Sequence, residues 1–122
     1  MIPAACPAYV AAVLMFYADL PDTPLRPAPR DQWMARRWHD QGVPISLVES
    51  ALLLASLRRL TRPADLPPLP PIHSLAYFQP VIQELQQQPL PDGYLDHLRL
   101  KLQQITKSRS NEVQKNTFSD DR

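Results

Sequence analysis

The chain has 122 residues, of which 44% are hydrophobic and 20% charged, and its formal net charge is +1. This length supports one domain with one core, and the small net charge excludes binding driven by overall charge alone. With 15 prolines and only 2 glycines, stiff connections are favoured over tight hairpins. We therefore expect an all-α fold, a single domain of about five helices joined by proline-rich straps.

Cellular location follows from the cysteine content and the apolar segments. The only cysteine is Cys6, so no intrachain disulfide can form, which fits a reducing cytoplasm. The longest apolar run, residues 8–18, is too short to span a bilayer. We expect a cytoplasmic protein without a membrane partner.

Two helices are predicted in the first third of the chain, separated by the linker 21–29. Apolar residues recur at three- and four-residue spacings over residues 7–20 and predict a central helix with a wide buried face. A second helix is predicted over residues 29–41. Gly42 follows it, where a left-handed C-cap is expected.

A third helix is predicted over residues 44–61. Val48, Ala51, Leu52 and Ala55 form its expected buried stripe. Arginines crowd its C-terminal end, where the helix dipole favours cations.

The strap "RPADLPPLPP", residues 62–71, has two interpretations. Its P-x-x-P pattern is typical of polyproline II ligands of SH3-type grooves. Alternatively, Leu66, Leu69 and Ile72 recur every three residues, the polyproline II period, and one apolar edge would then be pinned to the core. We favour the second interpretation because two core helices flank the segment.

The residues after the strap predict one helix with an unusual start. Ser74 is a candidate N-cap for a helix reaching Leu85, but Pro80 would lie in its second turn, where the ring clashes with a backbone carbonyl. Either the helix bends, or residues 74–79 form a short turn and the main helix begins at Pro80.

A last helix is predicted over residues 92–107, and it should bury Leu95, Leu98, Leu102 and Ile105. Residues 108–122 are polar and aperiodic and predict a disordered tail. The helical domain would then comprise residues 1–107.

Catalytic and metal-binding signatures are weak. His39, His73 and His97 lie on three different predicted elements, and Cys6 has no ligand-type residue close to it in sequence, whereas zinc sites usually show closely spaced ligand pairs. Two glycines cannot build a phosphate-binding loop of the GxxxxGK[ST] type. We therefore predict no metal, no cofactor, no catalytic residue and no enzymatic activity.

Charge is concentrated between Arg26 and Arg62, where seven arginines and three acidic residues give +4. Arg36 and Arg37 lie beside Trp33 and Trp38, so basic and aromatic residues interleave, as in proteins that bind single strands. The competing interpretation is that the tryptophans are core and the arginines a solvated face. The predicted nucleic-acid-binding residues are Arg30, Arg36, Arg37, Arg58, Arg59 and Arg62.

Two segments carry a family resemblance. "WHDQGVPISLVESALLLA", residues 38–55, and "SLAYFQPVIQEL", residues 74–85, resemble motifs of the DnaD-like family of bacterial replication-initiation and primosome-associated proteins. The matching residues are Trp38, Gly42, Val43, Val48, Ala51, Ser74, Leu75, Tyr77, Phe78 and Ile82. The resemblance implies a helical accessory domain that acts in replication, although the family's DNA-contacting tail motif is not evident. The chain also resembles small uncharacterised bacterial proteins, from which no activity transfers.

These observations lead to two functional hypotheses. The first is a non-enzymatic accessory protein that binds single- or double-stranded DNA, or a replication or mobile-element partner, through the arginine-rich surface. The alternative is a protein-interaction adaptor or homodimer that uses the apolar face of the first helix or residues 75–78. The predicted partner-binding residues are Trp33, Trp38, Tyr77 and Phe78.

Overall fold

The computed structural model describes residues 5–24 and 26–120, with side chains described for residues 6–24 and 26–108. Within these residues every regular element is a helix, so the all-α prediction is confirmed. The elements are α1 (Ala5–Ala18), α2 (Pro29–Asp40), α3 (Ile45–Leu60), the 3₁₀ helix η1 (Leu75–Phe78), α4 (Gln79–Gln87) and α5 (Tyr94–Asp120).

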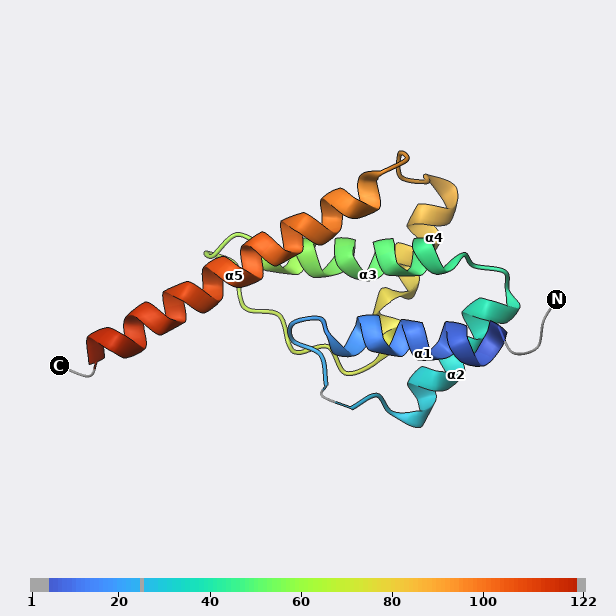
Figure 1. The fold of residues 1–122 in the computed structure, drawn as a ribbon, viewed down its shortest axis with the longest axis horizontal. Coiled ribbons are helices and arrows are strands. Elements are labelled where there is room, and N and C mark those ends of the chain that lie inside the picture. Colours follow the sequence, from blue (N-terminus) through green and yellow to red (C-terminus); the bar gives the residue numbers. More distant parts are fainter. Residues whose placement is uncertain (1–4, 25, 121–122) are drawn as a thin grey trace.

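Helix α3 is the centre of the fold. It packs against α1, α4, η1 and α5, while α2 packs mainly on α1 and η1. Figure 1 shows α1 and α3 side by side, with α5 running across the molecule and projecting beyond the other helices. The largest fully buried side chains of this core include Tyr17, Trp38, Leu52 and Phe78, contributed by α1, α2, α3 and η1.

A glycine with positive φ ends α2 and forms the turn to α3. Gly42 has φ +77°, a conformation that favours glycine. The N–H of Val43 donates to the carbonyl of Trp38, and that of Gly42 to the carbonyl of His39, both at 3.0 Å. This is a Schellman motif, and the predicted left-handed C-cap is confirmed.

Pro80 fits into the helix because the 3₁₀ helix η1 precedes α4. Ser74 accepts a hydrogen bond from the N–H of Ala76 at 3.1 Å and caps η1. Helix α4 then begins at Gln79, which places Pro80 in its first turn, where a missing N–H costs no intrahelical bond. The alternative with a short turn before the main helix is therefore correct.

The chain is fixed to the bundle where the strap ends. Ile72 is buried and its N–H donates to the carbonyl of Asp22 at 2.9 Å, but Leu66 and Leu69 are 43% and 39% exposed. The prediction that both leucines are pinned to the core is wrong. A turn closed by the N–H of Leu66 and the carbonyl of Pro63 reverses the chain before the extended part begins, so the apolar edge is not continuous.

Helix α5 buries Leu98 and Leu102 against the bundle, as predicted, while Leu95 and Ile105 are only half-buried. It continues past the expected end at Lys107 to Asp120. The helix boundary is corrected accordingly, while the disorder expected for residues 108–122 stays a prediction.

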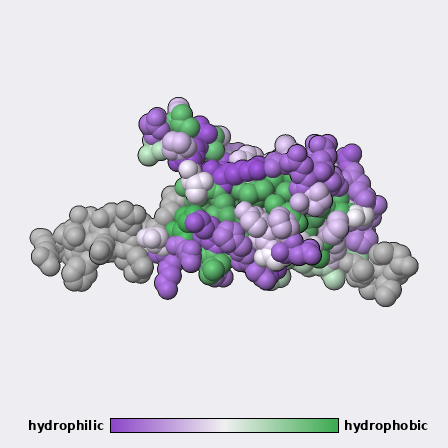
Figure 2. Space-filling view, turned by 90° about the horizontal axis from the view of Figure 1, so that it is seen from above, coloured by the Kyte–Doolittle hydropathy of each residue, from purple (hydrophilic) through white to green (hydrophobic). Residues whose placement is uncertain are grey.

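The surface mixes apolar and hydrophilic residues. On the face shown in Figure 2, a hydrophobic strip runs along the molecule between hydrophilic margins. Among the described residues, no helix combines the length and the apolar character needed to cross a membrane.

Candidate nucleic-acid interface

The arginines predicted to bind nucleic acid fall into two groups in the structure. The α2 cluster comprises Arg30, Arg36 and Arg37, and the α3 cluster comprises Arg58, Arg59 and Arg62, at and just after the C-terminal end of α3. The two clusters differ in how many of their guanidinium groups are already bound within the protein.

The exposed face of α2 is a continuous polar and aromatic stripe. Trp33, Arg36, Arg37, Asp40 and Gln41 follow i, i+3, i+4, i+7 and i+8 spacing, which places them on one face of a helix. They line a shallow hollow of about 290 Å³. The opposite face is buried through Asp31, Ala35 and Trp38.

Trp33 is the distinctive residue of this stripe. Its side chain is 62% exposed, which is unusual for a residue that normally buries most of its surface. The guanidinium carbon of Arg37 lies 5.7 Å from the Trp33 ring centroid, within cation–π range. Among the described side chains, neither Arg36 nor Arg37 forms an ion pair, so both charges remain available to a ligand.

Arg30 differs from its neighbours in the α2 cluster. Its Nη2 donates to the carbonyl of His73 at 3.0 Å, which ties the start of α2 to the segment before η1. The side chain is exposed, but part of its donor capacity serves the fold.

In the α3 cluster, Arg58 is committed to an ion pair. Its two terminal nitrogens donate to both carboxylate oxygens of Glu84 on α4, at 2.9 and 2.6 Å. This bidentate bond lowers the pKa of Glu84 and raises that of Arg58, because each charge stabilises the other.

Arg59 is bound within the protein by more groups than Arg58 is. Its side chain is only 8% exposed and Nη2 lies 3.8 Å from the Asp22 carboxylate. Nη2 also donates to the carbonyl of Pro70 at 2.8 Å, and Nη1 to the hydroxyl of Tyr77 at 3.2 Å. Arg59 therefore fastens the strap to the bundle. Only Arg62 of this cluster is exposed without an ion pair among the described side chains.

Two predicted partner-binding residues are core residues instead. Trp38 and Phe78 are fully buried, which corrects the surface role predicted for them. The indole N–H of Trp38 donates to the Gln79 side chain at 2.6 Å, and Phe78 meets the Tyr17 ring edge to face at 6.0 Å. Tyr77 remains exposed and Arg59 lies 5.4 Å above its ring.

A structurally important residue that the sequence interpretation missed is Asp31. It is 1% exposed and its carboxylate accepts from the N–H of Ala28 at 2.8 Å and from that of Leu75 at 2.9 Å. Its position in the first turn of α2 is typical of an N-terminal carboxylate, but the bond to η1 spans 44 residues and no local pattern indicates it.

The fold also brings Cys6 close to two residues that lie far from it in the sequence, His39 and Asp40. Cys6, His39 and Asp40 place one thiol, imidazole or carboxylate atom each within 4.8 Å of the others. Spacing along the chain could not reveal this group, because Cys6 belongs to α1 and the other two residues to α2.

Comparison with known proteins identifies no relative. No family model, no curated protein and no solved structure matches this chain. The resemblance to the DnaD-like family therefore remains a hypothesis that depends on the quoted motifs.

Proposed function

We propose that this protein is a non-enzymatic nucleic-acid-binding accessory protein whose contact surface is the exposed stripe of α2. The observation that carries this proposal is the exposed Trp33 with Arg37 over its ring and Arg36 beside it. An exposed aromatic face stacks on a base irrespective of sequence, while adjacent arginines bind the phosphates.

Single-stranded nucleic acid fits this surface best. The bases of a duplex are stacked inside it, whereas those of a single strand can stack on an aromatic side chain at a cost that the contact repays. The hollow beside Trp33 is shallow and open, so it offers a stacking platform without enclosing the base. A replication accessory role, as the DnaD-like resemblance implies, would expose the protein to such strands.

The test is fluorescence anisotropy of labelled single- and double-stranded DNA at about 50 and 200 mM salt. We expect tighter binding to the single strand and an affinity that falls steeply with salt. The double variant R36E/R37E should bind more weakly, with a salt slope reduced by about 0.7 for each lost phosphate contact. W33A should lose about 1–3 kcal/mol of binding free energy.

A matched control separates a surface contact from a general charge effect. Lys101→Glu with Lys107→Glu reverses two exposed charges on α5, the same net change as in R36E/R37E. This control should retain most of the affinity. Equal losses in the two double variants, or binding that does not respond to salt, would overturn the proposal.

A second candidate function is favoured by the exposed strap. Leu66 and Leu69 are exposed, and Leu69, Tyr77 and Val81 line a hollow of about 290 Å³ together with the three arginines of the α3 cluster. This surface suits a protein-interaction adaptor or homodimer, in which Tyr77 keeps its predicted role. For a homodimer, the mass measured by sedimentation equilibrium should rise with protein concentration. The variant L66S/L69S should abolish that rise without changing the melting temperature. A constant monomer mass in the unmodified protein would reject the homodimer.

A further inference from the structure

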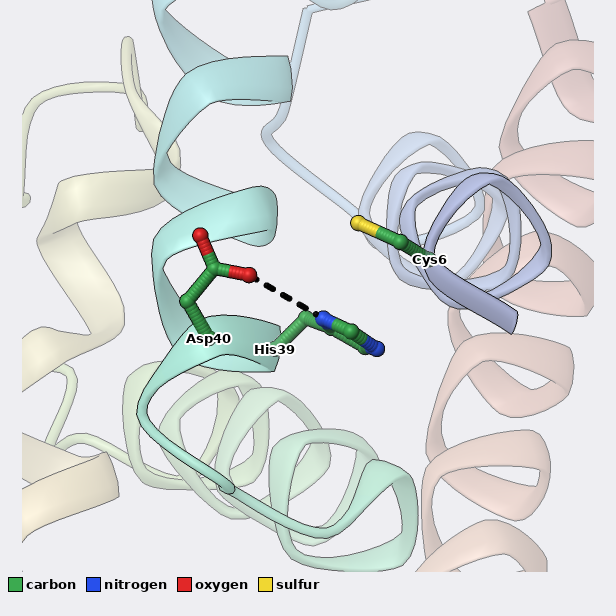
Figure 3. Close-up of side chains that lie close together, drawn as sticks. All are labelled: Cys6, His39 and Asp40. Carbon is green, nitrogen blue, oxygen red and sulfur yellow. Dashed lines mark hydrogen bonds and ion pairs between the residues drawn. The ribbon is translucent and has the colours of Figure 1, made fainter. Parts of the chain in front are cut away.

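Three side chains of types that commonly bind metals lie close together where α1 packs on α2. Cys6 lies in the first turn of α1, and His39 and Asp40 end α2. One ligand atom of each residue lies within 4.8 Å of the other two. Figure 3 shows the thiol directed from α1 toward the His39 and Asp40 side chains.

The spacing of these atoms is close to that of a tetrahedral zinc site. His39 Nδ1 and Asp40 Oδ1 are 3.2 Å apart, and zinc–nitrogen and zinc–oxygen bonds of about 2.1 Å give a tetrahedral edge of about 3.4 Å. With a zinc–sulfur bond of about 2.3 Å, the edges to Cys6 Sγ should be about 3.6 Å. A closure of up to about 1.2 Å from the 4.8 Å limit is within reach of side-chain rotation.

The two helix ends favour a cation that is held by anionic ligands. The C-terminal end of α2 carries partial negative charge, and the first turn of α1 stabilises an anionic ligand such as a thiolate. Among the described residues Asp40 has no arginine partner, and its close side-chain contact is with Nδ1 of His39, at 3.2 Å. A thiolate and a carboxylate together neutralise a divalent ion, which lowers the cost of holding it in a partly buried site.

The imidazole is oriented by its surroundings. The Tyr9 ring meets the His39 ring edge to face, with centroids 5.1 Å apart. The Tyr9 hydroxyl donates to the carbonyl of Val43 at 2.8 Å, which fixes the tyrosine. A held imidazole needs less ordering when it binds a metal, as with the outer-shell contacts of known sites.

We propose that Cys6, His39 and Asp40 bind one divalent cation of the zinc type, with a fourth position open to water or another ligand. A thiolate, an imidazole and a carboxylate form a donor set of intermediate softness, which suits Zn²⁺ and Co²⁺ better than Mg²⁺ or Ca²⁺. Three protein ligands leave one tetrahedral position free. The proposal does not depend on nucleic-acid binding by α2.

The experiment is a titration of the full chain with Co²⁺ under reducing conditions, followed by absorbance. We expect a thiolate-to-cobalt charge-transfer band and visible bands typical of tetrahedral cobalt, saturating at one ion per chain and lost on adding Zn²⁺. Because Cys6 is the only cysteine, the charge-transfer band reports this residue directly.

Variants assign the ligands. C6S should abolish the charge-transfer band, and H39Q and D40N should each weaken Co²⁺ binding by about 10–100-fold or more, since even outer-shell changes cost that much. Asp40 is exposed, so D40N leaves the core intact and remains informative if another variant unfolds. His97→Gln is the matched control, because His97 lies on α5 beside Tyr94 and should not alter binding.

Three results would overturn the proposal. One is the absence of a charge-transfer band at millimolar Co²⁺. Another is saturation at half an ion per chain, which would indicate that cysteines of two copies share a metal. The third is an affinity in H39Q and D40N within twofold of the unmodified protein, since the histidine and aspartate would then not be ligands.

Discussion

The α2 and α3 clusters look alike in the sequence but are used differently by the fold. In the α3 cluster, Arg58 is held by Glu84, and Arg59 is nearly buried among Asp22, Pro70 and Tyr77. In the α2 cluster, Arg36 and Arg37 are exposed, and no described carboxylate pairs with them. A cluster of positive charge therefore indicates a binding surface only where the fold leaves the guanidinium groups free.

The difference follows from where each helix lies. Helix α3 is central, and its C-terminal end is surrounded by α4, η1 and the strap, which present carboxylates and carbonyls to its arginines. Helix α2 is peripheral, and one of its faces meets solvent along its length. Position in the bundle thus decides whether an arginine stabilises the fold or remains available to a ligand.

The largest expected effect is on the free energy of unfolding, and it compares a residue on the buried face of α2 with one on its exposed face. Asp31→Ala removes two charge-assisted hydrogen bonds and leaves the N–H of Leu75 without its acceptor, so it should lower the free energy of unfolding by about 3 kcal/mol. Asp40→Ala changes an exposed acid of the same helix and should stay within about 0.5 kcal/mol. Urea denaturation of the metal-free protein measures both. Similar losses would contradict the distinction between the two faces.

An intermediate effect compares one arginine from each cluster. Arg59→Met should cost about 1–2 kcal/mol because it removes bonds to Pro70 and Tyr77. The cost is limited because Nε of Arg59 is buried without a hydrogen-bond partner in the described structure. Arg37→Met should change stability by less than about 0.5 kcal/mol. Thermal or urea unfolding that ranks the two variants in the opposite order would break the comparison.

The smallest expected effect concerns the exposed ion pair of the α3 cluster. The Arg58 guanidinium holds the pKa of Glu84 below its ordinary value, so the pair stabilises the fold above the unfolded pKa of about 4.3 and loses that contribution as pH falls through the lower folded value. Glu84→Gln should therefore lower the urea midpoint slightly at pH 7 and not at pH 2. A difference that persists unchanged at pH 2 would show that charge is not its cause.

Local patterns accounted for most of the helices. The sequence predicts the ends of α2 and α3 to within about two residues, and it also predicts the C-cap at Gly42 and the N-cap at Ser74. These features depend on residues close in sequence, whose backbone preferences act whatever the rest of the chain does. The end of α5 was misplaced because polar residues carry no periodic signal at that boundary.

The composition of the chain determined by itself that it folds as helices joined by proline-rich segments, and the spacing of apolar residues determined the buried stripe of α3. Only the tertiary structure decided that Trp38 is core and Trp33 exposed, that Arg59 holds the strap while Arg37 faces solvent, and that Cys6 meets His39 and Asp40. The physical reason is distance. Hydrogen bonds and ion pairs act over a few ångströms, and which side chains come that close depends on how α1, α2 and α3 pack.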